Sequence, residues 1–320
     1  MRIYLFLAAL TAAALILTPA IALPGGVDKP VDESQTELEN TVTVFLSSQN
    51  MPLKLPMTEY LVGAVSAEMP ASYHPQALMA QAVACHTYAL YRRSVENKSP
   101  TTSLLGADLS DDAKVHQGYL SKEDRKEKWG ESFEANEAKV RAAVEEVCTK
   151  IMTYQGDPIC AAFFAVSSGQ TESALTVFGD DIPYLQSVPS DADQLSPDCE
   201  QTVTLSETEF AESMQKLNGV SLSDNADEWI GDQKTAGRGF VEEITVGGKT
   251  IPGVSFRKAL SLRSAVFTVS RTESGFRIQT KGYGHLVGMS QYGANAMAAD
   301  GADWRQILTH YYKGVTISDE

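Results

Sequence analysis

The sequence predicts an α+β fold, with mixed helices, mainly antiparallel strands and a smaller inserted subdomain. Alternating apolar and polar residues, which are typical of strands, occur at 41–46 and 276–280. Segments with helix start signals occur at 58–68 and 76–93. Strands and helices mingle without the regular alternation of βαβ units, so an α+β class is favoured over a parallel α/β class.

The N-terminal residues 1–22 have the pattern of an export signal. They contain Arg2, a long apolar run and the small-residue pattern Ala20-Ile21-Ala22. If the segment is not cut, it is just long enough to span a bilayer, which takes about 20 apolar residues. We therefore expect an extracytoplasmic protein that is anchored in the cell membrane, or secreted if cleavage follows Ala22. Residues 23–40 are polar and typical of a tether.

Charge and cysteine usage restrict the partners. The chain of 320 residues carries a formal net charge of −15, which repels nucleic acids and anionic surfaces. Its four cysteines are widely spaced and include no CxxC pair, so they do not indicate a metal site. Disulfides stay open as an alternative to free thiols, with three full pairings. For Cys85, inside an alanine-rich segment, a buried free thiol is the preferred interpretation.

The first half of the chain is expected to begin with a strand at 41–46. Thr58 can cap a helix that runs to Glu68, and the following Met69-Pro70 stops it. Pro75 suits the first turn of the long helix 76–93. Residues 96–130 are polar and weakly periodic, and are expected to form a surface excursion.

The second half continues with a helix over about 134–150, in which Glu137 and Arg141 are spaced to pair, and then a hairpin. An acidic stretch from about 195 to 238 is expected to be an insertion, with a capping box at Ser206 and Glu209. Strands then return, and a final helix is expected at 304–312.

The most polar glycine-rich segment is Gly282–Gly293, GYGHLVGMSQYG, at an expected strand-to-helix turn. Glycine permits positive φ and close backbone approach, so a sugar could lie against the main chain. The candidate binding residues in this segment and in the SSGQT motif are Ser167, Ser168, Gln170, Tyr283, His285, Ser290, Gln291 and Tyr292.

Two other interpretations of this segment remain. Its G-x-G-x-x-x-G spacing is one residue longer than the dinucleotide fingerprint and has no βαβ context, which disfavours nucleotide binding. The polar groups can also satisfy only each other, and Ser167 and Ser290 can serve as turn caps. Only the density of polar residues favours ligand contact.

Glu68 is the candidate acid. A carboxylate at a helix C-terminus faces the negative end of the helix dipole, an effect of about 0.3–1 kcal/mol. The apolar neighbours Val65, Met69 and Pro70 add desolvation. Both effects favour the protonated form that general acid catalysis requires. From position alone, a helix-end glutamate that points into water is the preferred interpretation. Glu68 becomes a catalytic candidate because Pro70 and Tyr73-His74-Pro75 fix its surroundings in a tight turn between helices.

Three blocks of the sequence together resemble the SpoIID/LytB family. They are YLVGAVSAEMPASYHPQALMAQAVACHTYAL (60–90), AAFFAVSSGQTESALTVFGDDIPYLQSV (161–188) and GYGHLVGMSQYGANAMAADGADWRQILTHYYKG (282–314). The resemblance covers roughly residues 41–317, which we expect to form one catalytic domain.

The resemblance implies a peptidoglycan lytic transglycosylase with Glu68 as its catalytic acid and base. Such an enzyme cleaves the bond between N-acetylmuramic acid (MurNAc) and N-acetylglucosamine (GlcNAc) and leaves 1,6-anhydro-MurNAc ends, without water. Hydrolytic glycosidases normally need two carboxyl groups, and we noticed no second acid in the matching motifs. No cofactor is implied.

The implied setting is sporulation engulfment, although a vegetative role stays open. The implied partners are glycan strands freed of stem peptides, a cell-wall amidase and a membrane-anchored sporulation complex. The LytB branch suggests an alternative, a non-catalytic peptidoglycan-binding amidase enhancer. An exported zinc amidase or protease is disfavoured because the chain has no H-E-x-x-H motif.

The chain departs from the family pattern at three places. Many relatives carry Cys and His before a Q-x-Y block, where this chain has Ser110 and Val115 and only His116 remains. One histidine is a poor zinc site, so no structural zinc is expected. Ala165 and His86 stand where relatives often have His and Arg, which affects substrate contacts rather than Glu68.

Overall fold

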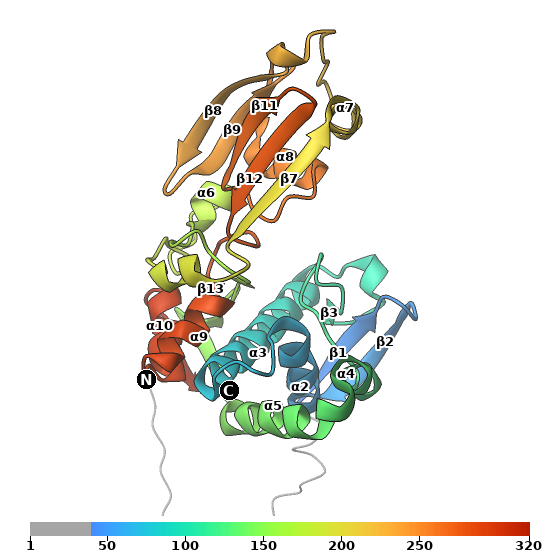
Figure 1. Ribbon diagram of the computed structural model, residues 1–320. Coiled ribbons are helices and arrows are strands. Elements are labelled where there is room, and N and C mark those ends of the chain that lie inside the picture. Colours follow the sequence, from blue (N-terminus) through green and yellow to red (C-terminus); the bar gives the residue numbers. More distant parts are fainter. Residues whose placement is uncertain (1–39) are drawn as a thin grey trace, which may run out of the picture.

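The computed structural model describes residues 40–320, which form two units (Figure 1). The mixture of helices and mostly antiparallel sheets confirms the α+β class. The expected signal or anchor at 1–22 and nearly all of the tether at 23–40 lie outside the described residues. No helix within residues 40–320 has the length and apolar character needed to cross a membrane.

The helix α3 (Pro75–Lys98) is the centre of the first unit. His74 caps its first turn by accepting a hydrogen bond from the Gln76 N–H, and Pro75 occupies the first helical position. Buried alanines, including Ala80 and Ala84, let neighbouring elements approach closely. The helices packed around α3 are α2 (Met57–Glu68), α5 (Phe133–Val147), α9 (Gln291–Ala299) and α10 (Trp304–Tyr311).

The helix α2 ends at Glu68, as expected, but the expected cap at Thr58 is wrong. The helix begins at Met57, directly after strand β2 (Met51–Pro56), and has no side-chain cap. The Met57 N–H donates instead to the Asn40 carbonyl at 2.9 Å, so a long-range backbone contact replaces the cap. The Met69 N–H closes the helix on the Val65 carbonyl, and Met69 is extended, as a residue before proline prefers.

Three small sheets complete the first unit. The expected strand 41–46 is β1 (Thr41–Leu46), which pairs with β2 antiparallel and with β3 (Leu109–Ser110) parallel. The second sheet has the order β14 (Thr316–Asp319), β4 (Lys150–Tyr154) and β5 (Asp157–Pro158). The third is the parallel pair β6 (Phe163–Phe164) and β13 (Met289–Ser290).

Residues 96–130 are not a surface excursion, because they fold back on the first unit. They supply β3, and α4 (Lys122–Trp129) inserts the fully buried Arg125 side chain. Arg125 donates to Glu137 at 2.8 Å and to Glu59 at 2.9 Å. The expected Glu137–Arg141 pair forms at 2.9 Å and joins the same cluster. These partners are distant in sequence, which explains why local periodicity missed the fold-back.

The second unit runs from β7 (Glu200–Ser206) to β12 (Gly275–Lys281) and has its own hydrophobic core. The expected capping box forms: Ser206 and Glu209 begin α7 (Glu207–Met214). One sheet has the order β11 (Phe267–Thr272), β12 and β7, and the other has the order β10 (Lys249–Pro252), β9 (Phe240–Val246) and β8 (Ile230–Ala236). The acidic stretch at about 195–238 supplies β7, α7, η4 (Ala226–Glu228) and β8, which are only the first part of this unit.

The core of the second unit is aromatic. Phe210 stacks on Phe276 with ring centroids 4.2 Å apart, and Phe256 of α8 (Gly253–Ala259) packs beside Phe210. The shorter helical segments of residues 40–320 are α6 (Ala174–Phe178), η1 (Thr102–Leu104), η2 (Gly130–Ser132), η3 (Asp191–Leu195) and η4 (Ala226–Glu228).

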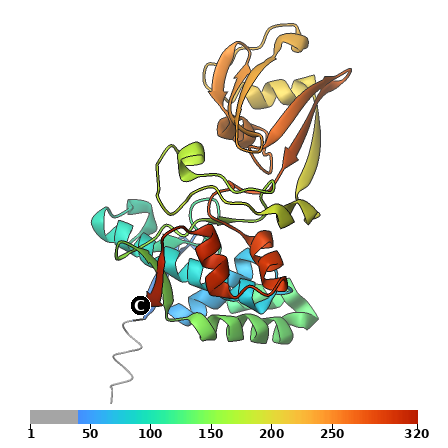
Figure 2. The same ribbon diagram turned by 90° about the vertical axis from the view of Figure 1, so that its left-hand side faces the viewer.

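The two units meet at a narrow junction, with the segment that follows β6 lying between them in both views (Figures 1 and 2). The chain leaves the first unit after Cys199 and returns at Gly282, whose N–H donates to the Cys199 carbonyl at 2.6 Å. A small third core joins Phe164 and Leu286 of the first unit to Phe240, Ala265 and Val266 of the second.

Candidate active site

Glu68 is the last residue of α2 and its side chain is half-buried. The carboxyl Oε1 accepts one hydrogen bond, from the Gly118 N–H at 2.6 Å. Within residues 40–320, Oε2 has no hydrogen-bond partner. Burial raises the pKa of Glu68, although the Gly118 hydrogen bond and the positive charge of Lys128 act in the opposite direction. The site therefore holds a carboxyl group that binds its proton more tightly than a solvent-exposed glutamate does, and one of its oxygens has no partner in residues 40–320.

The loop before α4 supports Glu68. Gln117 donates to the Tyr60 hydroxyl and, at 3.3 Å, to the Cys85 carbonyl, while its buried Oε1 has no partner. A Cβ on Gly118 would lie only 3.1 Å from Glu68 Oε1, so a larger residue there would crowd the carboxyl group that accepts the hydrogen bond. Sequence reasoning missed the hydrogen bond between Gly118 and Glu68, although Gly118 is the central residue of the Q-x-Y block beside the family's usual metal ligands.

Lys128 of α4 is a charged neighbour of Glu68. Its Nζ donates to the carbonyl of Ser66 at 2.8 Å, which fixes the ammonium near the end of α2. Desolvation lowers the pKa of Lys128, and the nearby Glu68 opposes this shift. The ammonium gives the carboxylate form of Glu68 a partial counter-charge, so Glu68 can both hold and release a proton.

The glycine-rich segment begins at the end of β12 and leads through β13 into α9, so the expected strand-to-helix turn forms. Ser290 is the N-cap of α9: its Oγ accepts from the Gly293 N–H and donates to Asp193 Oδ1 at 2.9 Å. The Ser167 N–H donates to the other oxygen of Asp193 at 2.8 Å, and Ser167 Oγ accepts from the Gly169 N–H. Both serine side chains are fully buried and used within the fold.

Asp193 connects Ser167 and Ser290, because it accepts a hydrogen bond from each. Sequence reasoning missed this residue. Burial raises its pKa, while hydrogen bonds from Ser167, Ser290 and Ser190 act in the opposite direction. A Cβ on Gly293 would overlap the Ser190 hydroxyl and its neighbour, the Tyr311 hydroxyl. Nothing in the sequence distinguishes Asp193 from Asp191, the other acid of DADQL (191–195).

His285 is held between two aromatic rings, with centroid distances of 5.8 Å to Phe164 and 5.7 Å to Phe178. Its Nδ1 accepts a hydrogen bond from the Val287 N–H at 3.1 Å. Burial, together with the positive charge of Arg257, lowers the pKa of His285 to about 4. The ring is therefore neutral at neutral pH. Tyr283, in contrast, is 45% exposed.

The other candidate binding residues occupy different environments. Ser168 Oγ is buried without a partner in residues 40–320, and Gln170 donates to Ser187 Oγ at 2.6 Å. The Gln291 side chain is buried and reaches Gln81 on α3 at 3.4 Å. The Tyr292 N–H donates to the Ala165 carbonyl, and its side chain is half-buried. A binding role stays a prediction for each.

The turn that follows Glu68 lies against α9. The His74 N–H donates to Asn295 Oδ1 at 2.7 Å, and the nearby Tyr292 contributes to a raised pKa of Tyr73, after the larger effect of burial. The first and third sequence blocks are therefore neighbours in space, although no hydrogen bond or ion pair joins the Glu68 side chain to the glycine-rich segment in the described residues.

Glu172 belongs to the second block and was overlooked as an acid. Its side chain is almost completely buried, and Oε1 has no hydrogen-bond partner in residues 40–320. Burial, with a contribution from Glu242, raises the pKa of Glu172 to about 7. A Cβ on Gly237, at the turn between β8 and β9, would lie 2.9 Å from Oε1, so the carboxyl group faces the second unit.

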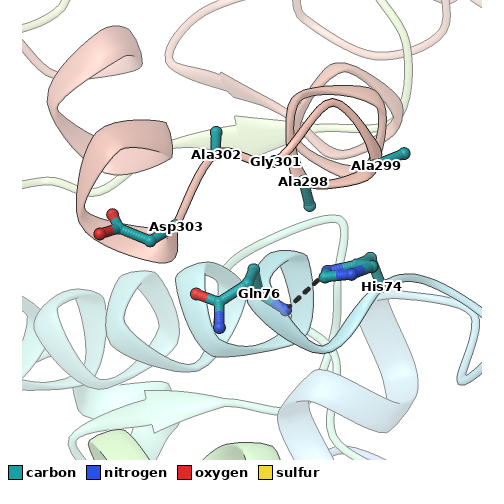
Figure 3. Close-up of a pocket in the computed structure, with 7 residues that line it drawn as sticks. All are labelled: His74, Gln76, Ala298, Ala299, Gly301, Ala302 and Asp303. Atoms are coloured by element: carbon teal, nitrogen blue, oxygen red, sulfur yellow. Dashed lines mark hydrogen bonds between the residues drawn. The ribbon is translucent and has the colours of Figure 1, made fainter.

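An open pocket of about 350 Å³ lies between the start of α3 and the α9–α10 turn (Figure 3). Its polar groups are already used: His74 accepts from Gln76, Gln76 Oε1 accepts from the Trp304 N–H, and Asp303 caps α10. The pocket contains none of the expected site residues. Its lining residues are His74, Gln76, Ala298, Ala299, Gly301, Ala302 and Asp303.

Residues 40–320 contain no group of three His, Cys, Asp or Glu side chains that could hold a metal ion. Ser110 and His116 contact each other instead: the Ser110 N–H donates to His116 Nδ1 at 3.0 Å. The four cysteines are all unpaired. The expectation of no zinc stays a prediction.

Comparison with known proteins identifies the family. A family model described as "Stage II sporulation protein" matches residues 48–154, which include Glu68 and Gly118. Stage II sporulation protein D of Bacillus amyloliquefaciens is 39% identical over 292 residues, covering 91% of this chain and 82% of the relative. Its counterpart in Bacillus subtilis (strain 168) is 38% identical over 282 residues, covering 87% and 79%.

A more distant relative is an amidase enhancer of Bacillus subtilis (strain 168). It is 28% identical over 310 residues, covering 81% of this chain but 40% of the relative. The coverage and identity of the two stage II sporulation proteins, with the matched family model, are sufficient to assign the chain. It belongs to the stage II sporulation protein D family of sporulation proteins.

Proposed function

We propose that the protein is a peptidoglycan lytic transglycosylase with Glu68 as its catalytic acid and base. The observation that carries the proposal is the Glu68 carboxyl group, whose pKa is raised by burial, with one oxygen held by the Gly118 N–H and the other free. A group of this kind can donate a proton near neutral pH and then accept one.

The reaction needs only these two proton transfers. Glu68 protonates the oxygen between MurNAc and GlcNAc, and the bond from that oxygen to C1 of MurNAc breaks. The C6 hydroxyl of the same MurNAc forms a new bond to C1 and gives its proton to the Glu68 carboxylate. The product carries a 1,6-anhydro ring, water is not consumed, and Glu68 is protonated again.

The other acids with raised pKa values support a single-acid mechanism. Both oxygens of Asp193 accept hydrogen bonds inside the fold, and the Glu172 carboxyl group faces Gly237 at the junction. Neither makes a direct contact with Glu68 in the described residues. Hydrolytic glycosidases normally use two carboxyl groups that flank the bond.

The proposed setting is the extracytoplasmic cell wall during engulfment, with the N-terminal segment as membrane anchor. The proposed substrate is a glycan strand freed of stem peptides by an amidase. The similarity to an amidase enhancer is compatible with such a partnership. It also supports a second candidate function, a wall-binding protein that stimulates an amidase without cleaving glycans.

The test uses the exported part of the protein with purified glycan strands and mass spectrometry of the products. Glu68→Gln should reduce the release of 1,6-anhydro-MurNAc ends by about 100-fold to 10,000-fold, the usual contribution of general acid–base catalysis. Glu127→Gln, the same substitution at an exposed position on α4, is the matched control and should retain activity. Wild-type protein that binds strands without producing anhydro ends would support the second function.

A further inference from the structure

The guanidinium of Arg257 lacks the carboxylate partner that a half-buried arginine normally has. Among the arginines of residues 40–320, only Arg257, Arg277 and Arg305 have no Asp or Glu within ion-pair distance. Arg277 and Arg305 are exposed and solvated, whereas Arg257 is half-buried. A partly desolvated guanidinium without a carboxylate partner in the described residues is available to bind an anion from outside the protein.

The position of Arg257 is fixed from within its own unit. It lies in the last turn of α8, and its Nε donates to the Leu262 carbonyl at 3.2 Å. The two terminal nitrogens of the guanidinium make no hydrogen bond in residues 40–320. Those two nitrogens form the fork that binds a carboxylate with two parallel hydrogen bonds.

The surroundings of Arg257 come from the glycine-rich segment of the first unit. Desolvation lowers the pKa of Arg257, and the Tyr283 hydroxyl lies within its electrostatic range, as does the neutral His285 ring. Two backbone hydrogen bonds join Tyr283 to Val166. The Arg263 guanidinium lies over the Tyr283 ring, with its Cζ 5.1 Å from the ring centroid. Arg263 is already paired with Asp198, so Arg257 is the unpaired cation here.

Exposed aromatic surface accompanies this charge. Tyr283 and Phe178 are 45% and 51% exposed, and Phe178 packs on the His285 ring. Exposed aromatic rings next to a cation and a hydroxyl group suit a ligand with an apolar face and a carboxylate, and a muramyl sugar has both. In a strand freed of stem peptides the lactyl group of MurNAc is a free carboxylate, whereas in an intact strand it is an uncharged amide.

We infer that Arg257 and Tyr283 form a carboxylate-binding subsite at the junction of the two units, which takes the free lactyl group of a MurNAc residue in the glycan strand. The subsite rests on the proposed function, because it assumes that glycan strands are the substrate. It distinguishes peptide-free strands from intact strands through charge, and it gives the second unit a direct role in substrate selection.

The experiment measures binding by calorimetry in the Glu68→Gln background, where strands are not cleaved. The probes are peptide-free glycan strands, strands with intact stem peptides and chitin oligosaccharides of equal length, which have no lactyl group. The parent should bind peptide-free strands about tenfold more tightly than chitin oligosaccharides, and this preference should weaken with added salt. Arg257→Gln should remove the preference, and Tyr283→Phe should reduce it.

Arg277→Gln, at an exposed arginine of the same unit, should keep the preference, and melting temperatures check that every variant is folded. Equal preference in Arg257→Gln and Arg277→Gln would overturn the subsite. Equally tight, Arg257-dependent binding of intact strands would assign the carboxylate to the stem peptide and overturn the lactyl assignment. If the parent binds no glycan at all, the proposed function fails, and the subsite fails with it.

Discussion

Glu68 and the glycine-rich segment differ in how their polar groups are used. Around Glu68 there are few polar groups, but they are incompletely satisfied: Glu68 Oε2 and the buried Gln117 Oε1 have no partner in residues 40–320. In and beside the glycine-rich segment there are many, but Ser290 of the segment and the neighbouring Ser167 both donate hydrogen bonds to Asp193.

The difference teaches that the density of polar residues is a poor guide to a binding site. Buried polar groups are normally hydrogen-bonded, so a cluster of them can be wholly structural. A free donor or acceptor beside a group with a perturbed pKa is better evidence for chemistry. By this criterion Glu68 and the junction around Arg257 stand out, and Ser167 and Ser290 do not.

The largest effect on stability is expected from Asp193→Ala. The substitution leaves the buried Ser167 N–H and the Ser290 hydroxyl without an acceptor, which costs about 1–3 kcal/mol for each group. The free energy of unfolding in urea should fall by about 4 kcal/mol. Asp191→Ala, which removes only the exposed ion pair with Arg238, should lower it by less than about 1 kcal/mol. Equal stability of the two variants, with activity lost only in Asp193→Ala, would make this cluster catalytic.

Glu172→Gln should stabilise the protein at alkaline pH. The pKa of Glu172 is raised from 4.5 to about 7 in the folded protein, so the folded state binds the proton more tightly than the unfolded state. The contribution of Glu172 to stability is therefore largest below pH 4.5 and is lost as the pH rises to about 7. The shift corresponds to about 3 kcal/mol.

Urea unfolding at pH 4.5 and pH 8 checks this prediction. The Gln variant mimics the protonated acid, so it should match the wild type at the lower pH and exceed it at the higher one. Glu243→Gln, at an exposed glutamate of β9, should have no such pH-dependent effect. Parallel pH profiles for wild type and Glu172→Gln would show that the buried carboxyl group does not titrate in this range.

The smallest effect is expected from Lys128→Met, and it sharpens the interpretation of Glu68. Because the ammonium lowers the pKa of Glu68, its removal should raise that pKa further. The acid must be protonated at the start of the reaction, so the alkaline limb of kcat/KM should move to higher pH. Lys128→Arg keeps the charge and should leave the limb in place. A limb that moves to lower pH would exclude Glu68 as the titrating acid.

Features with local signals were predictable from the sequence. The strand at 41–46, the Pro75 start of α3, the capping box of α7 and the end of α2 all follow from neighbouring residues. Features created by distant contacts were not. The start of α2 depends on the Asn40 carbonyl, and the fold-back of residues 96–130 depends on Arg125 meeting Glu59 and Glu137.

The candidate site shows the same division. The helix end at Glu68 was predicted from local residues, whereas its role as the acid rests also on the family resemblance and stays a prediction. Gly118, Lys128 and Asp193 act on residues at least 25 positions away in the chain, and nothing in the pattern around them indicates those partners. Arg257 was missed because the absence of a counter-charge can be recognised only once the neighbours are in place.

The hydrogen bond between the Cys199 carbonyl and the Gly282 N–H bears on how this protein evolved. Because the ends of the second unit lie side by side and most of its core is its own, loss of the unit would leave the chain ends close together and would uncover only the small third core at Phe164 and Leu286. In a homologue without the second unit, a short turn could join the chain at Cys199 directly to Gly282. Such a homologue would keep Glu68 and lose Arg257, so one recombination event would separate the strand cleavage proposed for Glu68 from the strand selection proposed for Arg257.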